Sequence, residues 1–182
     1  MSARTPLFHA AYGRMLETLP GPIRRIHDVS GRREWSGRIS SRHGGSLIAR
    51  LLCRAARFPP AGEDAPLRMV MQRTNRGETW TRHFSSHRMR THLRPGKARG
   101  TIEETLWPVT AISTMKPDAD GVTQDLIALR VMGVPLPAVL RPAFAVRESA
   151  QGTRYLFSIT VHLPWGGLLV HYDGWLETAE DS

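Results

Sequence analysis

The chain has 182 residues, of which 41% are hydrophobic and 23% are charged, and its formal net charge is +9. This length and composition exclude a disordered tail and suit one folded domain with its own core. The longest uncharged stretch near the middle, residues 131–140, is broken by two prolines and is too short to cross a bilayer. The single cysteine, Cys53, excludes an intramolecular disulfide and a thiolate metal cluster. We expect a cytoplasmic protein that has no cofactor and no metal site.

The first third of the chain is predicted to be mainly helical. Apolar residues recur at helical spacing after Pro6, which predicts an amphipathic helix over 6–19 that ends at the Pro-Gly-Pro of 20–22. A short helical turn is expected at 23–27 and a first strand at 34–41.

A second helix is predicted over 47–57, with Ser46 as its N-cap. Its leucines and isoleucine fall on one face and its arginines on another. We expect the apolar face to pack against the sheet, and the alternative, a helix that lies on a membrane surface, stays open. Cys53, inside this helix, is expected to be a small apolar filler.

From Pro66 onward, helical spacing gives way to alternation of apolar and polar residues, which predicts a meander of strands. The candidate strands are 67–74, 78–84, 87–94, 101–106, 109–116, 123–132, 144–149, 154–163 and 168–177. Short connections between successive strands predict antiparallel neighbours. Residues 133–137 interrupt the meander, and 138–140 are expected to form one helical turn.

These elements predict an α+β fold in which N-terminal helices pack on a strongly curved, meandering antiparallel β-sheet, a half-barrel or barrel-like shape. We expect a single domain over 1–182, with helical segments mostly in 6–57 and the sheet mostly in 66–177. The early helices are expected to fill the concave side with their apolar faces. Sheets curved in this way often hold a hydrophobic cavity.

Three polar residues of the last two strands are the candidate catalytic group. His162, His171 and Asp173 fall between the apolar positions of these strands, so they are expected on the same face of the sheet. Two imidazoles and a carboxylate can ligate a metal or move a proton. A row of solvent-facing polar residues is the alternative.

The register of this last hairpin depends on its turn. A two-residue turn at 166–167 sets His162 opposite His171. A wider turn over 164–167 shifts the pairing by two residues and sets His162 against Leu169. Both registers keep the apolar face of the hairpin intact.

The positive charge is concentrated in one half of the chain. Residues 1–99 hold 20 of the 25 Lys and Arg but 6 of the 16 Asp and Glu. A strand over 87–94 would carry Arg88, Arg90, His92 and Arg94 on one face, close to Trp80 and Phe84. Cations among aromatic rings suit single-stranded nucleic acid. The alternative is that the two halves of the chain neutralise each other and that the aromatic side chains belong to the core.

Several short motifs occur in the order typical of a known bacterial family. They lie at 26–28, 58–64, 78–84, 133–137, and from 163–164 to 174–176. Over residues 7–176 the sequence resembles the domain of unknown function 4166. Members of that family stand alone or follow a saccharopine-dehydrogenase-like NAD-binding domain. The resemblance implies the standalone form, with a possible oxidoreductase partner, and it supplies no catalytic residues.

We expect a small ligand-binding or accessory module that holds an apolar or amphiphilic ligand in the concave sheet. Aromatic side chains with one charged group commonly line such sites. The residues expected near the cavity are Trp35, Trp80, Arg82, Trp107 and Tyr172. The alternatives are a hydrolase-like or lyase-like enzyme that uses the His/Asp cluster, and a protein whose basic half binds nucleic acid or an anionic surface.

Overall fold

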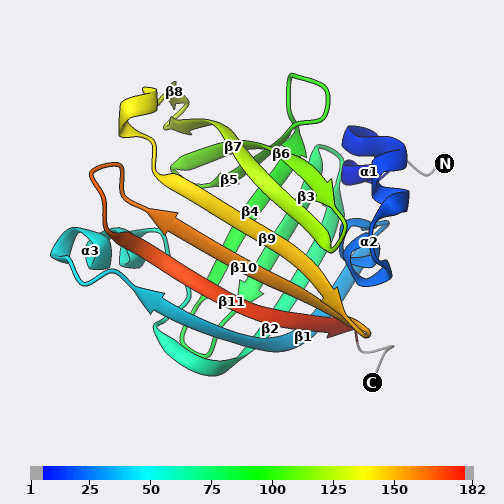
Figure 1. Ribbon diagram of the computed structural model, residues 1–182, viewed down its shortest axis with the longest axis horizontal. Helices are drawn as coiled ribbons and strands as arrows, with labels where there is room; N and C mark the ends of the chain where they lie inside the picture. The colour runs from blue at the N-terminus through cyan, green and yellow to red at the C-terminus, as the bar shows by residue number, and fades with distance from the viewer. Residues whose placement is uncertain (1–5, 179–182) are drawn as a thin grey trace.

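The computed structural model describes residues 6–178, which form one antiparallel sheet of eleven strands with short helices at its two ends (Figure 1). The strands are β1 (Arg32–His43), β2 (Gly62–Thr74), β3 (Gly77–His83), β4 (Arg88–Pro95), β5 (Ile102–Leu106), β6 (Val109–Asp118), β7 (Gly121–Val131), β8 (Val134–Pro135), β9 (Ala143–Gln151), β10 (Arg154–His162) and β11 (Leu168–Thr178). The helices are α1 (Leu7–Tyr12), α2 (Gly21–His27) and α3 (Leu47–Ala55), with 3₁₀ turns η1 (Gly13–Thr18) and η2 (Ala138–Leu140).

The sheet closes into a barrel of ten strands. Its strand order is β6-β5-β4-β3-β2-β1-β11-β10-β9-β7-β8, and β6 also pairs with β7 over its length. Each barrel strand pairs with the next one along the chain, and the pairing of the first strand, β1, with the last, β11, closes the ring, whereas the two-residue strand β8 only extends β7. The expected curved antiparallel meander is confirmed, and of the two shapes expected from the sequence the barrel-like one is observed; the fold is dominated by this barrel and has few helices. Closure gives every strand of the barrel two paired neighbours, although β7 and β9 pair over only four residues.

One end of the barrel is closed by α1, η1 and α2. Leu7 and Phe8 of α1 and Ile23 and Ile26 of α2 are buried. The prediction of one continuous helix over 6–19 is wrong in part: α1 ends at Tyr12, and Gly13, whose φ of 56° lies in the left-handed region, begins the 3₁₀ turn η1. The early segments therefore form a cap over one end of the barrel.

Helix α3 lies at the opposite end of the barrel, between β1 and β2 (Figure 1). Ser46 is its N-cap as predicted, because its Oγ accepts a hydrogen bond from Ala49 N at 3.1 Å. The expectation that the apolar face of α3 packs against the sheet is wrong, since within this helix only Ala49 and Cys53 are buried. The helix packs close to β11, where Cys53 Sγ lies 3.3 Å from the carbonyl oxygen of Leu169, and only small side chains fit there.

The β10–β11 hairpin adopts the register of the wider turn. Thr160 pairs with His171 and Val161 with Val170, two residues away from the register of a two-residue turn. A bulge then sets His162 opposite Leu168, one residue short of the Leu169 expected from the wider turn. The single-domain organisation over 1–182 stays a prediction, because residues 1–5 and 179–182 lie outside the described part.

Candidate functional site

A charged pair lies inside the barrel. Arg82 of β3 and Glu104 of β5 both occupy inward positions of their strands, and Arg82 Nη2 lies 3.7 Å from Glu104 Oε1. Arg82 Nη1 also donates a hydrogen bond of 3.2 Å to Thr91 Oγ1 on β4. Strands β3, β4 and β5 are neighbours, so alternation places these three polar side chains on one patch of the inner wall.

Arg82 is the last residue but one of β3, toward the end of the barrel that carries α3, and Glu104 also lines a small cavity with Phe8 and Tyr12 of the cap. The Arg82 side chain is 17% exposed and that of Glu104 is 35% exposed. Nearer the α3 end, the inner wall carries apolar side chains that are only partly buried, including Leu106, Phe144 and Ile159. A barrel of eight strands is just filled by its own side chains, so one of ten strands has a wider interior.

A second polar group lies beneath the helical cap and is closed off from solvent. His27 Nε2 of α2 lies 2.7 Å from Glu148 Oε2 of β9, and Gln124 Nε2 donates a hydrogen bond of 2.6 Å to Glu148 Oε1. Glu78 Oε2 accepts a hydrogen bond of 2.9 Å from Trp80 Nε1. These contacts join the cap to the barrel wall, and the cavity beside them is only about 20 Å³, enough for one water molecule.

Burial controls the protonation of the groups inside the barrel. It raises the pKa of Tyr172 to about 12, although the charge of Arg82 opposes this shift. It raises the pKa of Tyr155 well above the usual value, and the nearby Glu148 carboxylate adds to the effect. Burial also raises the pKa of Glu78. Both tyrosines therefore stay protonated at neutral pH and can donate hydrogen bonds.

Comparison with known proteins identifies the family to which this barrel belongs. The family model described as domain of unknown function (DUF4166) matches residues 19–176, which is most of the chain. The chain belongs to this family. The resemblance found in the sequence motifs is thereby confirmed. No curated protein and no solved structure matches the chain.

In this family member, three of the five residues expected near a cavity come together inside the barrel. Trp80, Arg82 and Tyr172 all point inward, and the Arg82 guanidinium lies 5.6 Å from the centre of the Trp80 ring. Trp35 also points inward but is fully buried in the core. Trp107 lies at the rim of the α3 end and is 73% exposed. Whether any of these residues binds a ligand stays a prediction.

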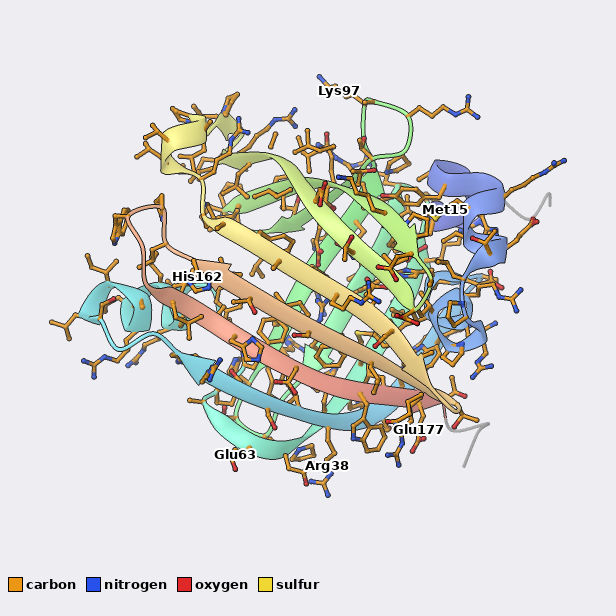
Figure 2. The ribbon with its side chains drawn as sticks, in the orientation of Figure 1. Met15, Arg38, Glu63, Lys97, His162 and Glu177 are labelled. Atoms are coloured by element: carbon orange, nitrogen blue, oxygen red, sulfur yellow. The ribbon has the colours of Figure 1, made fainter. Side chains whose placement is uncertain are left out.

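The candidate catalytic residues lie on the outer face of the barrel. His171 Nδ1 lies 2.8 Å from Thr160 Oγ1, and His171 Nε2 lies 3.0 Å from Asp173 Oδ1. His162 is exposed at the bulge, near the α3 end (Figure 2), and makes no hydrogen bond to either of the other two. Within residues 6–178, no group of three His, Cys, Asp or Glu side chains is placed to hold a metal ion. The catalytic role of these residues stays a prediction.

The basic stripe and its expected aromatic neighbours lie on opposite faces of the sheet. On β4 the Arg and His side chains are exposed outside the barrel, whereas Trp80 and Phe84 are buried inside it. The prediction that cations and aromatic rings share one face of this segment, as single-stranded nucleic acid would require, is therefore wrong. Binding of a polyanion by charge alone stays a prediction, as do the oxidoreductase partner and the cytoplasmic location. None of the described helices is long and apolar enough to span a bilayer.

Sequence reasoning missed Glu104 and Thr91 as partners of Arg82, and His27 and Glu148 as a buried pair. A signal for the first group exists in the sequence. Thr91 stands between two apolar inward positions of β4. Glu104 lies two residues after the apolar Ile102, so alternation places both on the same face of β5. No comparable signal exists for His27 and Glu148, because 121 residues separate them.

Proposed function

We propose that this protein is a small binding module that takes an amphiphilic ligand into the barrel through its α3 end. The observation that supports the proposal most is the pair of Arg82 and Glu104, two charged side chains inside a barrel that solvent still reaches. Charged groups in a protein interior are costly unless they are paired and hydrogen-bonded, so a polar patch at this depth suits the recognition of a polar group.

The charges of this patch favour an uncharged polar head group. Arg82 offers hydrogen-bond donors and Glu104 offers acceptors, and together they carry no net charge. The phenol of Tyr172 is close enough for both charges to influence its pKa. A hydroxyl head group both donates and accepts hydrogen bonds, and an ester head group only accepts them. Either one can bind to this patch without leaving one of the two ions unpaired.

The wall between this patch and the rim suits an apolar tail. Leu106, Phe144 and Ile159 face the interior there and remain partly exposed. Contact with a hydrocarbon chain would remove this apolar surface from water, which stabilises a complex by about 25 cal/mol per Å². The ligand class that combines these features is a medium-chain or long-chain amphiphile with a neutral head, such as a monoacylglycerol.

The proposal is tested by calorimetric titration with monodecanoylglycerol below its micelle concentration, and with naphthalene as an apolar probe that has no head group. We expect one saturable site for the amphiphile. The double variant Arg82→Met, Glu104→Leu replaces the inner pair with apolar groups and should still fold, because such exchanges are often neutral for stability. Its affinity for monodecanoylglycerol should fall about tenfold, while its affinity for naphthalene should not fall.

A matched control removes an ion pair from the outside of the barrel. Lys116 and Asp125 form an exposed ion pair across β6 and β7, so Lys116→Met, Asp125→Leu changes the same kinds of groups without touching the interior. Binding of both probes by this variant should equal that of the wild type. Absence of saturable binding, or an equal loss in the outer variant, would contradict the proposal.

A further inference from the structure

Helix α3 turns its apolar face toward solvent. Leu47 is 71% exposed and Leu51 is 67% exposed, and Ile48 and Leu52 beside them are also exposed. The face that contacts the barrel consists of the small side chains of Ala49 and Cys53. An amphipathic helix normally buries its apolar stripe, so this face is available for a partner outside the described chain.

The same end of the barrel carries the other large exposed apolar side chains of the loops. Trp165 lies in the β10–β11 connection, Trp107 in the β5–β6 connection, and Val134 and Val139 between β7 and β9. Figure 1 shows α3, the β10–β11 connection, β8 and η2 together at the end opposite to α1 and α2. Four segments that are far apart in the sequence thus contribute to one apolar surface around this end of the barrel, which we call the rim surface.

The loops that carry the rim surface contain positive charges and no carboxylates; the nearest acidic residues along the chain, Glu63 and Asp64, lie at the start of β2, where Asp64 pairs with Arg38. The connecting segments at this end are 44–61, 84–87, 107–108, 132–142 and 163–167, and none of them contains an Asp or Glu. Arg50, Arg54 and Arg57 follow one side of α3, and all three are exposed. Within the described residues, none of these three forms an ion pair. Exposed arginines without acidic partners attract an anionic surface.

We propose that the rim surface docks on an anionic lipid bilayer, with α3 lying in the interface. Leucines and tryptophans that enter the boundary between head groups and acyl chains, beside arginines that reach the phosphates, are the pattern of an interfacial helix. Trp107 and Trp165 suit the same depth, because indole rings favour the membrane–water interface.

A second copy of the chain fits the rim surface less well than a lipid surface does. Two such surfaces placed face to face would bring the arginines of one copy close to those of the other. The loops at this end contain no carboxylate that could pair with them, so the two copies would repel each other. The docking proposal does not depend on a ligand in the barrel. Docking would place the α3 end of the barrel against the membrane, which is a source of amphiphiles. A ligand could then move from the membrane into the barrel without passing through water.

The experiment measures binding of the full chain to vesicles of phosphatidylglycerol and phosphatidylcholine in equal parts, and to vesicles of phosphatidylcholine alone. We expect binding to the mixed vesicles that is at least tenfold stronger than binding to the neutral ones and that weakens with salt. Leu47→Ser, Leu51→Ser should weaken it about tenfold or more, and should leave stability unchanged because both side chains are already exposed. Exposed Ile127 on the wall of β7 provides the control Ile127→Ser, which should bind as the wild type does.

The contribution of charge has its own matched pair of variants. Arg50→Gln, Arg54→Gln and Lys97→Gln, Arg99→Gln each remove two positive charges, and Lys97 lies in the loop near α1, away from α3 (Figure 2). The first should weaken binding to the mixed vesicles about 10-fold to 30-fold, and the second should change it less than threefold. Equal losses in both variants, no binding to anionic vesicles, or a dimer that Leu47→Ser, Leu51→Ser converts to a monomer would overturn the proposal.

Discussion

His27 of α2 and Glu148 of β9 form a buried pair in which Nε2 lies 2.7 Å from Oε2. Their side chains are 0% and 4% exposed, and the Phe8 ring packs on His27 with 4.1 Å between ring centres. Gln124 donates to the second carboxylate oxygen. The pair therefore fixes the helical cap to the barrel wall at a point that water does not reach.

We predict that His27→Ala destabilises the protein by about 3–4 kcal/mol, because it leaves the Glu148 carboxylate buried with one partner fewer. The measurement is the free energy of unfolding in urea. The control is His171→Ala on the outer face, where the partner Asp173 is 52% exposed and the cost should be below about 1 kcal/mol. Similar costs for the two variants would contradict the role given to the buried pair.

The buried carboxyl of Glu78 predicts a particular pH dependence of stability. Burial raises the pKa of Glu78 in the folded protein above its usual value of 4.5. The unfolded chain therefore loses this proton first as pH rises, so the stability contributed by Glu78 is full below its unfolded pKa and is lost as pH rises through the folded pKa. Glu78→Gln removes this loss and keeps an acceptor for Trp80.

The measurement for Glu78 is the difference in free energy of unfolding between Glu78→Gln and the wild type, followed from pH 4 to pH 8. We expect this difference to change in favour of the variant as pH rises. Only the change of this difference with pH is diagnostic, because a poorer fit of the amide adds the same amount at every pH. A difference that stays constant or moves in favour of the wild type would show that the pKa of Glu78 is not raised.

Cys53 is predicted to be unreactive in the folded protein. Burial raises the pKa of its thiol to about 11, so about one molecule in a thousand carries the thiolate at pH 8. Its Sγ also donates to the carbonyl oxygen of Leu169. Reaction with an aromatic disulfide reagent at pH 8 should be slow in buffer and complete within seconds in concentrated guanidinium. Complete labelling of the native protein within seconds would refute the prediction.

The adjacent glycines before α3 should respond differently to substitution by alanine. A Cβ at Gly44 would overlap the carbonyl oxygen of Leu168, whereas a Cβ at Gly45 would meet no atom within 4 Å. Gly44→Ala must therefore move β1 away from the start of β11, at a cost of at least about 2 kcal/mol. Gly45→Ala should stay within about 0.5 kcal/mol of the wild type. Thermal unfolding of the two variants tests this, and equal melting temperatures would contradict it.

Much of the local structure could be predicted from the sequence. Alternation located nearly every strand to within a few residues, and the Ser46 cap began α3 at the expected position. The alternation of side chains holds in the strands as observed: Trp80 and Arg82 lie on one face of β3. Glu103 and Glu104 lie on opposite faces of β5, since Glu103 pairs with Arg94 and Arg130 whereas Glu104 pairs with Arg82.

The sequence by itself determined which face of each strand is apolar, because side-chain alternation is a local property of an extended chain. Only the tertiary structure decided that the first strand, β1, pairs with the last strand, β11, and so closes the barrel, because closure depends on the summed tilt and stagger of ten strands. It also decided that α3 buries Ala49 and Cys53 and exposes Leu47 and Leu51. A periodic pattern shows that a helix has an apolar face, but what covers that face depends on the space that the rest of the fold leaves beside it.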